Sequence, residues 1–411
     1  MNTDVYAVII GAGASGIVCA CRTAALNPDK KVLLLEKADR IGKKLLVTGN
    51  GRCNLTNTNS SDKYYHGEGA KELAALLFQK YDSSYVLDWF HSIGLFTVTE
   101  EDGRVYPSSY SASSVLDVLR AELERRQVEI RCGCKVLDIM PTRTGYQVLT
   151  QDGAVFTQKL VIATGGKADY AYKESGSQDI FKMLKLRTNH PTPSLSPVSV
   201  KSPVTKMLKG IRVKGKVSLF VKGEKVKEES GEIQFAEDAL SGICIFNLSR
   251  TPNVRRGCEI ALSLLPDMSS DEIENELRGR IKKDPSSEIQ KLFVGIFRKN
   301  IGIALLKSAK ISPSAAASSL SDNDIIRLSK LINNWRFETV PRFDMNGAQV
   351  TAGGVKVSDI IAEDFEHIAH EGLYIIGEAL DADGDCGGYN LQFAFASALC
   401  AAERMNMEEL L

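Results

Sequence analysis

A glycine-rich turn near the N-terminus constrains the fold of this chain more than any other feature. Residues 5–10 form a continuous apolar run, residues 11–16 read Gly-Ala-Gly-Ala-Ser-Gly, and residues 17–26 are rich in small side chains that suit a helix. A second, mainly apolar run at 31–36 follows a short polar link. Such runs are typical of strands buried in a parallel sheet. The order strand, glycine turn, helix and strand therefore predicts a βαβ unit.

The spacing of the three glycines is that of a dinucleotide-binding turn. Gly11 makes the tight turn, Gly13 lets the backbone approach a pyrophosphate, and Gly16 lets the helix pack close to the strand. The N-terminus of the helix offers free N–H groups and partial positive charge to phosphates. Glu36 lies 20 residues after Gly16, where its carboxylate can accept hydroxyls of an adenosine ribose. The sequence therefore predicts a dinucleotide bound at this turn.

Two further segments favour FAD over NAD as that cofactor. A predicted strand at 160–163 runs into Thr164-Gly165-Gly166, a pattern that packs beside the dinucleotide in many flavoproteins. Near the C-terminus, Gly377-Glu378 and the segment 387–392 combine an acidic residue with a helix start, whose N–H groups would point at the flavin ring. A second Gly-x-Gly-x-x-Gly motif is absent, which disfavours a separate NAD domain. The cofactor residues expected from these turns are Gly11, Gly13, Ala14, Ser15, Gly16, Glu36, Thr164 and Gly165.

A change in composition near residue 190 divides the chain. A stretch rich in Pro and Ser begins there, alternating residues follow at 198–248, and a helical period with a charged face runs over 269–337. We therefore predict an α/β protein with a Rossmann-like FAD-binding domain and an inserted β-barrel plus α-helical bundle. The predicted domains are residues 1–189 with 351–411 for FAD binding, 190–268 with 338–350 for the barrel, and 269–337 for the bundle.

Within the FAD-binding domain the remaining patterns predict individual elements. The expected helices are 68–94, 113–127 and 391–404, the expected β-meander is 128–140, 146–150 and 154–158, a turn is expected at 351–355, and a buried strand at 372–377.

Composition excludes several classes of function. Lys+Arg and Asp+Glu each number 51, so a neutral chain is expected to lack an electrostatic grip on nucleic acid or on an acidic membrane. No stretch of 18 apolar residues and no secretory signal is present. The 9 cysteines fit a reducing compartment, and no metal-ligand spacing is found. We expect a cytoplasmic protein that takes a small-molecule substrate and no metal; the oligomeric state is left open.

Longer motifs resemble one flavoprotein family. Residues 42–57 read GKKLLVTGNGRCNLTN, residues 377–398 read GEALDADGDCGGYNLQFAFASA, and the shorter strings 240–242 and 350–355 also match. Over essentially the whole chain the sequence is similar to the BaiN-type flavoproteins, also called the YhiN-like or aminoacetone-oxidase-like family. The resemblance implies one FAD domain with an inserted β-barrel that carries a helical bundle. Asn50 is a departure, because a small residue, often glycine, is expected there.

The resemblance also implies which residues hold FAD. Lys44 and the segment 51–54 would run past the phosphates and flavin, the backbone of Val136 would contact adenine, and the C-terminal loop would surround the ribityl chain and ring. The matching residues are Gly11, Gly13, Gly16, Glu36, Lys37, Lys44, Gly51, Arg52, Cys53, Asn54, Val136, Gly377, Glu378, Asp385, Gly388, Asn390 and Leu391.

Two reactions are linked to that family: reduction of an enone in bile-acid-like steroids, and oxidation of a small amine with release of hydrogen peroxide. Enone reduction needs a hydride, a proton donor and a group that polarises the carbonyl. Arg52 is always charged and suits the last role, and Tyr389 can donate a proton, so both are predicted catalytic residues.

We therefore expect an FAD-dependent oxidoreductase that reduces an activated C=C bond of a small organic substrate in the cleft between the FAD domain and the insert. NADH or NADPH would be a transient reductant. An FAD-dependent amine oxidase that releases hydrogen peroxide and a flavin-dependent RNA-modifying protein are the alternatives.

Overall fold

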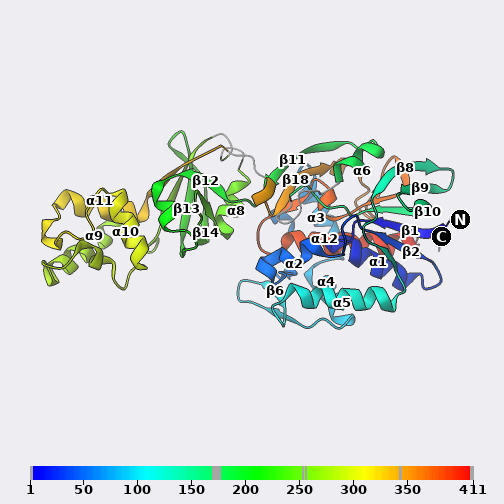
Figure 1. The fold of residues 1–411 in the computed structure, drawn as a ribbon, viewed down its shortest axis with the longest axis horizontal. Coiled ribbons are helices and arrows are strands. Elements are labelled where there is room, and N and C mark those ends of the chain that lie inside the picture. Colours follow the sequence, from blue (N-terminus) through cyan, green and yellow to red (C-terminus); the bar gives the residue numbers. More distant parts are fainter. Residues whose placement is uncertain (1–2, 169–176, 252–253, 255–256, 342–344, 408–411) are drawn as a thin grey trace. The chain divides into compact units, whose positions relative to one another are not determined.

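The computed structural model describes residues 3–168, 177–251, 254, 257–341 and 345–407, and the chain divides into two compact units. The first unit comprises Met1–Ser194 with Met345–Leu411, and the second comprises Leu195–Asp344 (Figure 1). Both ends of the chain therefore build the first unit. None of the helices in these ranges combines the length and the apolar character needed to cross a membrane.

A largely parallel sheet forms the centre of the first unit. Five strands in the order β20, β10, β1, β2 and β7 run parallel, and the predicted Rossmann-like fold class is confirmed. One edge carries the antiparallel β19, and β8 and β9 form an antiparallel meander against the first half of β10. The strands are β1 (Thr3–Ile10), β2 (Val32–Leu35), β7 (Glu129–Arg131), β8 (Val136–Thr142), β9 (Gly145–Thr150), β10 (Gly153–Ile162), β19 (Glu366–His367) and β20 (His370–Ile375).

Helices cover this sheet because its strands are apolar on both faces. Ala7, Val8 and Ile9 of β1 and Leu33, Leu34 and Leu35 of β2 are fully buried. Helix α1 follows the glycine turn and packs against both α5 and α12 (Figure 1). The hydroxyl of Tyr6 donates to the carbonyl oxygen of Met405 at 3.1 Å, which joins the first strand to the last helix. The helices of this unit are α1 (Ala14–Leu26), α2 (Lys43–Val47), α3 (Ala70–Leu77), α4 (Ser83–Ser92), α5 (Ala112–Arg125), α6 (Ser177–Met183) and α12 (Tyr389–Met407).

Several predicted elements of this unit have different bounds in the structure; the predicted strand 128–140, for example, is the two strands β7 and β8. The predicted helix 68–94 is the pair α3 and α4, because the carboxylate of Asp82 caps a new helix by accepting a hydrogen bond from Tyr85 N at 2.9 Å. The predicted strands 154–158 and 160–163 are one strand, β10, which pairs with β9 along its first half and with β20 along its second half.

The predicted turn 351–355 is a strand. β18 (Val350–Val355) pairs antiparallel with β11 (Thr188–Ser194). Gly353 has a φ of +96°, and a Cβ added there would lie 2.5 Å from the carbonyl oxygen of His190. The glycine that suggested a turn therefore allows two backbones to approach each other within a strand pair.

The second unit is a closed antiparallel barrel whose connections carry helices, as the predicted fold class has it. The barrel order is β12-β15-β14-β13-β16-β17. Burial alternates along Trp335–Thr339, and these residues form the strand β17. The predicted helical bundle, 269–337, therefore ends before this strand. The elements are β12 (Val198–Lys201), α7 (Pro203–Met207), β13 (Arg212–Val221), β14 (Glu224–Phe235), β15 (Ala239–Ser241), α8 (Ile243–Ser249), β16 (Glu259–Ser263), α9 (Ser270–Lys283), α10 (Lys299–Ser308), α11 (Asp322–Asn333) and β17 (Trp335–Thr339).

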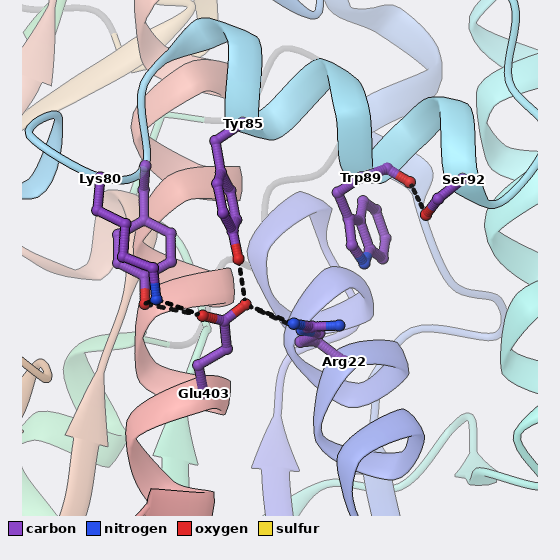
Figure 2. A network of polar contacts seen from close by, with 7 residues as sticks. Arg22, Lys80, Tyr85, Trp89, Ser92 and Glu403 are labelled. Carbon is purple, nitrogen blue, oxygen red and sulfur yellow. Dashed lines mark hydrogen bonds and ion pairs between the residues drawn. The ribbon is translucent and has the colours of Figure 1, made fainter.

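A buried carboxylate ties three helices of the first unit together. Glu403 of α12 accepts hydrogen bonds from Arg22 Nη2 of α1 at 2.7 Å, from Lys80 Nζ at 2.9 Å, and from the hydroxyls of Tyr81 and Tyr85 at 3.0 and 2.6 Å (Figure 2). Burial by itself raises the pKa of Glu403, but the hydrogen bonds from Tyr85, Lys80 and Arg22 outweigh it and hold the pKa below its usual value. The ionised carboxylate therefore stabilises the packing of α1 and α4 on α12.

Replacing this carboxylate, Glu403→Gln, is expected to lower the free energy of unfolding of the first unit by about 2 kcal/mol at pH 7, because hydrogen bonds to a charged group are lost. A carboxyl whose pKa is lowered on folding stabilises the fold above its unfolded pKa, so the difference from wild type should shrink below about pH 4. Trp89 lies in α4 beside the cluster, so its fluorescence in a Trp335→Phe background follows this unit during urea unfolding (Figure 2).

The matched control is Glu124→Gln, which changes an exposed glutamate of α5. It should alter the unfolding free energy by less than about 0.5 kcal/mol. Equal stability of Glu403→Gln and the control at pH 7 would contradict the assignment of Glu403 as an ionised tie between helices.

Candidate functional site

The glycine turn borders a space free of protein atoms. A Cβ added at Gly13 would meet no atom of the described residues within 4 Å. A Cβ at Gly11 would lie 2.5 Å from the carbonyl oxygen of Ala163, and one at Gly16 would lie 1.9 Å from the carbonyl oxygen of Gly11. Two of the glycines are therefore required for packing, whereas Gly13 leaves room in front of the N-terminus of α1, where a phosphate group is favoured.

Glu36 is held at the end of β2 by the backbone around it. Its Oε2 accepts the N–H of Ala12 at 2.9 Å, and its Oε1 accepts the N–H of Ala38 at 2.8 Å. Each carboxylate oxygen keeps a further lone pair for a ligand hydroxyl. The carbonyl oxygen of Glu36 accepts the N–H of Cys134 at 2.9 Å, which places the start of β8, at Val136, near this carboxylate.

Five buried polar side-chain atoms lack a hydrogen-bond partner within the described ranges, and two of them bear on this site. These two are Oγ1 of Thr164, just after β10, and Oδ1 of Asn54. Gly165 follows Thr164 with a φ of +68°, and a Cβ there would also meet no described atom within 4 Å. Buried polar groups are rarely left without a partner. Open backbone at Gly13 and Gly165 together with orphaned polar atoms is what a dinucleotide cofactor would fill, so the residues present fit FAD.

The segment after the βαβ unit carries the predicted Arg52 and Cys53. The guanidinium of Arg52 lies over the ring of Tyr106, 4.9 Å from its centroid, and the Arg52 side chain is exposed. Cys53 is fully buried, and this burial raises the pKa of its thiol to about 12. Cys53 is therefore a packing residue in its neutral form, whereas Arg52 presents a fixed positive charge to solvent. Asn50 has a φ of +57°, a conformation that glycine adopts more easily.

An ion pair links this segment to the C-terminal loop. Lys44 Nζ lies 2.6 Å from Glu378 Oε2, and the other carboxylate oxygen accepts the N–H of Thr351 at 2.8 Å. The hydroxyl oxygen of Thr351 in turn accepts the N–H groups of Lys167 and Ala168, both at 2.7 Å. Four segments that are remote in sequence therefore meet around Glu378.

The C-terminal loop is folded back on itself by Asn390. Its Oδ1 accepts the N–H of Gly384 at 2.8 Å, and its Nδ2 donates to the carbonyl oxygen of Gly384 at 2.9 Å. Gly388 has a φ of +101°, and a Cβ there would lie 2.6 Å from the backbone of Thr56 and 2.9 Å from Asn54 Oδ1. The loop thus packs directly on the segment that carries Arg52.

Aromatic rings surround the start of α12. Tyr389 is buried and stacks on Tyr64, with ring centroids 4.2 Å apart and planes 16° apart. The hydroxyl of Tyr65 donates to the carbonyl oxygen of Tyr389 at 2.8 Å. Burial and a hydrogen bond with Tyr64 raise the pKa of Tyr389, so its hydroxyl is neutral over the physiological range.

The structure brings most predicted site residues together. Beyond the contacts above, a Cβ at Gly377 would lie 2.7 Å from Ser15 Oγ, so α1 and the C-terminal loop also touch. Arg52 and Tyr389 stack on different tyrosines, Tyr106 and Tyr64. The remaining predicted residues are Ala14 and Leu391, which pack against the core, Lys37, which is exposed after β2, and Gly51, which has a φ of +81°.

Several residues of the site were not identified from the sequence. They include Thr351, the partner of Glu378, and Gln392, whose side-chain oxygen accepts the hydroxyl of Thr56 at 2.6 Å. His66 lies 2.9 Å from Asp385 through its Nε2, a pair that no local motif indicates. The described residues contain no group of three or more His, Cys, Asp or Glu side chains able to hold a metal ion.

Comparison with known proteins gives a family match over almost the whole chain. Residues 5–404 match the family model described as HI0933-like protein Rossmann domain. The chain is 35% identical over 404 residues to the 3-dehydro-bile acid delta(4,6)-reductase of Clostridium scindens, with 96% of this chain and 97% of that protein covered. It is 27% identical over 409 residues to the ribosomal RNA dihydrouridine synthase of Escherichia coli, with 97% of each protein covered.

Solved structures share the fold at low identity. The 3-ketosteroid delta1-dehydrogenase of Sterolibacterium denitrificans is 12% identical with a TM-score of 0.53, and 99% of this chain and 100% of that chain are covered. The 3-ketosteroid-delta4-(5alpha)-dehydrogenase of Rhodococcus jostii is 15% identical with a TM-score of 0.50, and 97% of each chain is covered.

Substitutions of Gly13 and Gly16 are expected to have different effects, the first on the binding of FAD and the second on stability. Gly13→Val should abolish the yellow colour of the purified protein while leaving its melting temperature without cofactor almost unchanged, because the new side chain enters only the open space. Gly16→Val should instead lower the melting temperature by several degrees, because its Cβ collides with the Gly11 backbone. Flavin absorbance per chain and thermal unfolding of the cofactor-free proteins measure the two effects. A Gly13→Val protein that still carries one FAD per chain would contradict this placement of the cofactor.

Proposed function

The chain belongs to the HI0933-like family and is an FAD-dependent oxidoreductase, and from this premise we propose that it reduces a carbon–carbon double bond conjugated to a carbonyl. The proposed substrate is a small organic enone of the steroid or bile-acid type. NADH or NADPH is the proposed source of electrons. Because the sequence has no second glycine motif for a separate NAD domain, the nicotinamide would bind only transiently at the flavin. The nine free cysteines fit a reducing compartment such as the cytoplasm.

The observation that carries this proposal is the 35% identity, over 96% of this chain, to a protein named for bile-acid reduction. In a 3-dehydro bile acid, the delta(4,6) double bonds are conjugated to the 3-oxo group. A protein that reduces them must add a hydride at a carbon remote from the carbonyl and a proton at a carbon nearer to it. The site must therefore combine a bound flavin with an electrophilic group and a proton source.

The residues of the first unit support this proposal by their fit to FAD. The N-terminus of α1 beside Gly13 would hold the pyrophosphate, and Glu36 would hold the adenosine ribose. Lys44, the orphaned oxygens of Thr164 and Asn54, and the C-terminal loop would hold the rest of the cofactor. When bound, FAD supplies two-electron hydride chemistry.

Arg52 and Tyr389 are the proposed groups for the substrate carbonyl. The Arg52 guanidinium is exposed and kept in one orientation by the ring of Tyr106, so it can stabilise negative charge on an oxygen. Tyr389 is a neutral hydroxyl with a raised pKa, which suits a hydrogen-bond donor. Arg52 is exposed to solvent, whereas the ring of Tyr389 is buried against Tyr64 at the start of α12.

RNA modification is the second candidate. A relative 27% identical and a relative from Haemophilus influenzae 25% identical are each named ribosomal RNA dihydrouridine synthase. Formation of dihydrouridine also saturates a double bond conjugated to a carbonyl, in the uracil ring. The reaction type is therefore shared by both candidates, and they differ in the molecule that carries the bond.

Anaerobic mixing with NADH and with NADPH should bleach the flavin absorbance of the purified protein. Addition of a 3-oxo-Δ4 steroid should then restore the absorbance and yield a product heavier by two hydrogens, which mass spectrometry detects. Restoration by unmodified ribosomal RNA but by no steroid would favour the second candidate. If neither nicotinamide bleaches the flavin but a small amine does, with peroxide formed in air, the reductase proposal is wrong.

Arg52→Gln is expected to lower kcat/KM for the steroid enone by about 10²-fold, because one electrophilic donor to the developing oxyanion is removed. Arg52→Lys should recover part of the loss, since it keeps the charge but not the planar stack on Tyr106. Steady-state kinetics with the enone measure both. Arg120→Gln, on the exposed face of α5, is the matched control and should match wild type. Equal losses in Arg52→Gln and Arg120→Gln would argue against the proposed role.

A further inference from the structure

A histidine–carboxylate pair lies beside the C-terminal loop, and its histidine has no role in the function proposed above. His66 Nε2 and Asp385 Oδ1 are 2.9 Å apart. The His66 side chain is 34% exposed and that of Asp385 19%, so a small ligand can reach the imidazole. Because Nε2 is engaged by the carboxylate, Nδ1 is the ring nitrogen that can serve a ligand.

Strand pairing fixes His66 beside the C-terminal loop, the loop that packs against Asn54. The short strand β4 (Tyr65–His66) pairs antiparallel with β21 (Asp383–Gly384), and His66 is opposite Asp383. The N–H of Asp385 donates to the carbonyl oxygen of Tyr64 at 2.9 Å, which extends this pairing. His66 is thus held opposite the start of the C-terminal loop, which continues into Gly388 and Asn390.

The residue after His66 is fixed equally firmly. Gly67 has a φ of +120°, and a Cβ there would lie 2.0 Å from the carbonyl oxygen of Asp381. The chain on both sides of the imidazole is therefore pinned to the segment 381–385. This gives the imidazole the fixed position that a proton-transferring group requires.

The chemistry of the pair suits a proton donor. A carboxylate that accepts the Nε2–H fixes the tautomer of the imidazole and stabilises its protonated form, which then donates from Nδ1. Asp383 lies opposite His66 in the strand pair, and the charges of Asp385 and Arg104 act on the neighbouring Tyr389 and Cys386.

Tyr389 is a weaker proton donor by the same reasoning. Its ring is buried against Tyr64, and burial together with the hydrogen bond to that tyrosine raises its pKa. A phenol in this state donates a hydrogen bond well but gives up its proton poorly near pH 7. The polarising role of Tyr389 and the proton-donating role of His66 are therefore separate.

We propose that His66 is the catalytic acid that protonates the substrate carbon next to the carbonyl, with Asp385 as its positioning residue. The proposal rests on the proposed function, in which a nicotinamide-reduced flavin is the two-electron reductant. Hydride addition forms a C–H bond at the β-carbon and moves the π electron pair toward the α-carbon. The N–H bond at Nδ1 of His66 breaks as the second C–H bond forms, and the neutral imidazole regains its proton from solvent.

The test compares two electron acceptors in His66→Gln, with His91→Gln as the matched control. A 3-oxo-Δ4 steroid needs a proton on carbon, whereas ferricyanide takes electrons alone. The ratio of steroid to ferricyanide reduction should fall by about 10²-fold in His66→Gln, the range for loss of a general acid. His91 lies on α4 and bonds to Thr97, so His91→Gln should keep the wild-type ratio.

A second variant separates chemistry from structure. Asp385→Asn keeps the shape of the pair but no longer stabilises the imidazolium. The rate of steroid reduction should fall as pH rises through the His66 pKa, and this fall should move to lower pH in Asp385→Asn. A purely structural pair would leave the pH profile in place.

The outcomes of the test are distinct. An unchanged steroid-to-ferricyanide ratio in His66→Gln, or an unmoved pH profile in Asp385→Asn, overturns the assignment of His66 while the proposed function stands. A wild-type protein that reduces ferricyanide with NADH or NADPH but no conjugated enone overturns the proposed function, and the role of His66 with it.

Discussion

The close approach of three backbone segments at the glycine turn is the constraint on which the rest of the structure depends. Gly11 lies against the carbonyl oxygen of Ala163, and Gly16 lies against the carbonyl oxygen of Gly11, at distances that no Cβ would allow. This contact brings the ends of β1 and β10 and the start of α1 to one point. The open backbone of Gly13 and the unpartnered hydroxyl of Thr164 are placed there as a direct result.

Helix α12 joins the C-terminal part of the chain to the N-terminal part, and it has two roles. Its first turn carries Tyr389 and Asn390, which shape the C-terminal loop of the site. Its last turns carry Glu403, which accepts donors from α1 and from the region of α4. Packing of the core and placement of the loop are therefore coupled through one helix, and loosening the Glu403 end is expected to disturb the Asn390 end.

Local sequence motifs predicted the glycine turn, but they did not predict contacts between residues that are far apart in the sequence. The glycine spacing and the apolar runs at β1 and β2 depend only on neighbouring residues, so they were readable, and the Rossmann-like fold class is confirmed. The pairing of β18 with β11 was not predicted, because a glycine such as Gly353 indicates a turn when only its neighbours in sequence are known. Its close approach to the backbone of His190 is evident only from the structure. His66 and Asp385 are 319 residues apart, and only the β4–β21 pairing joins them.

The distribution of the proposed residues between the units bears on substrate choice. Every residue proposed to hold FAD or to act on the conjugated bond lies in the first unit, within Met1–Ser194 or Met345–Leu411. The second unit, Leu195–Asp344, contributes none of them. Saturating a conjugated double bond makes the same demands in a steroid and in a uracil ring: a hydride, a proton and a polarised oxygen. Relatives named for a bile acid and for ribosomal RNA can therefore share the first unit's chemistry, provided that recognition of the rest of the substrate is determined by other residues.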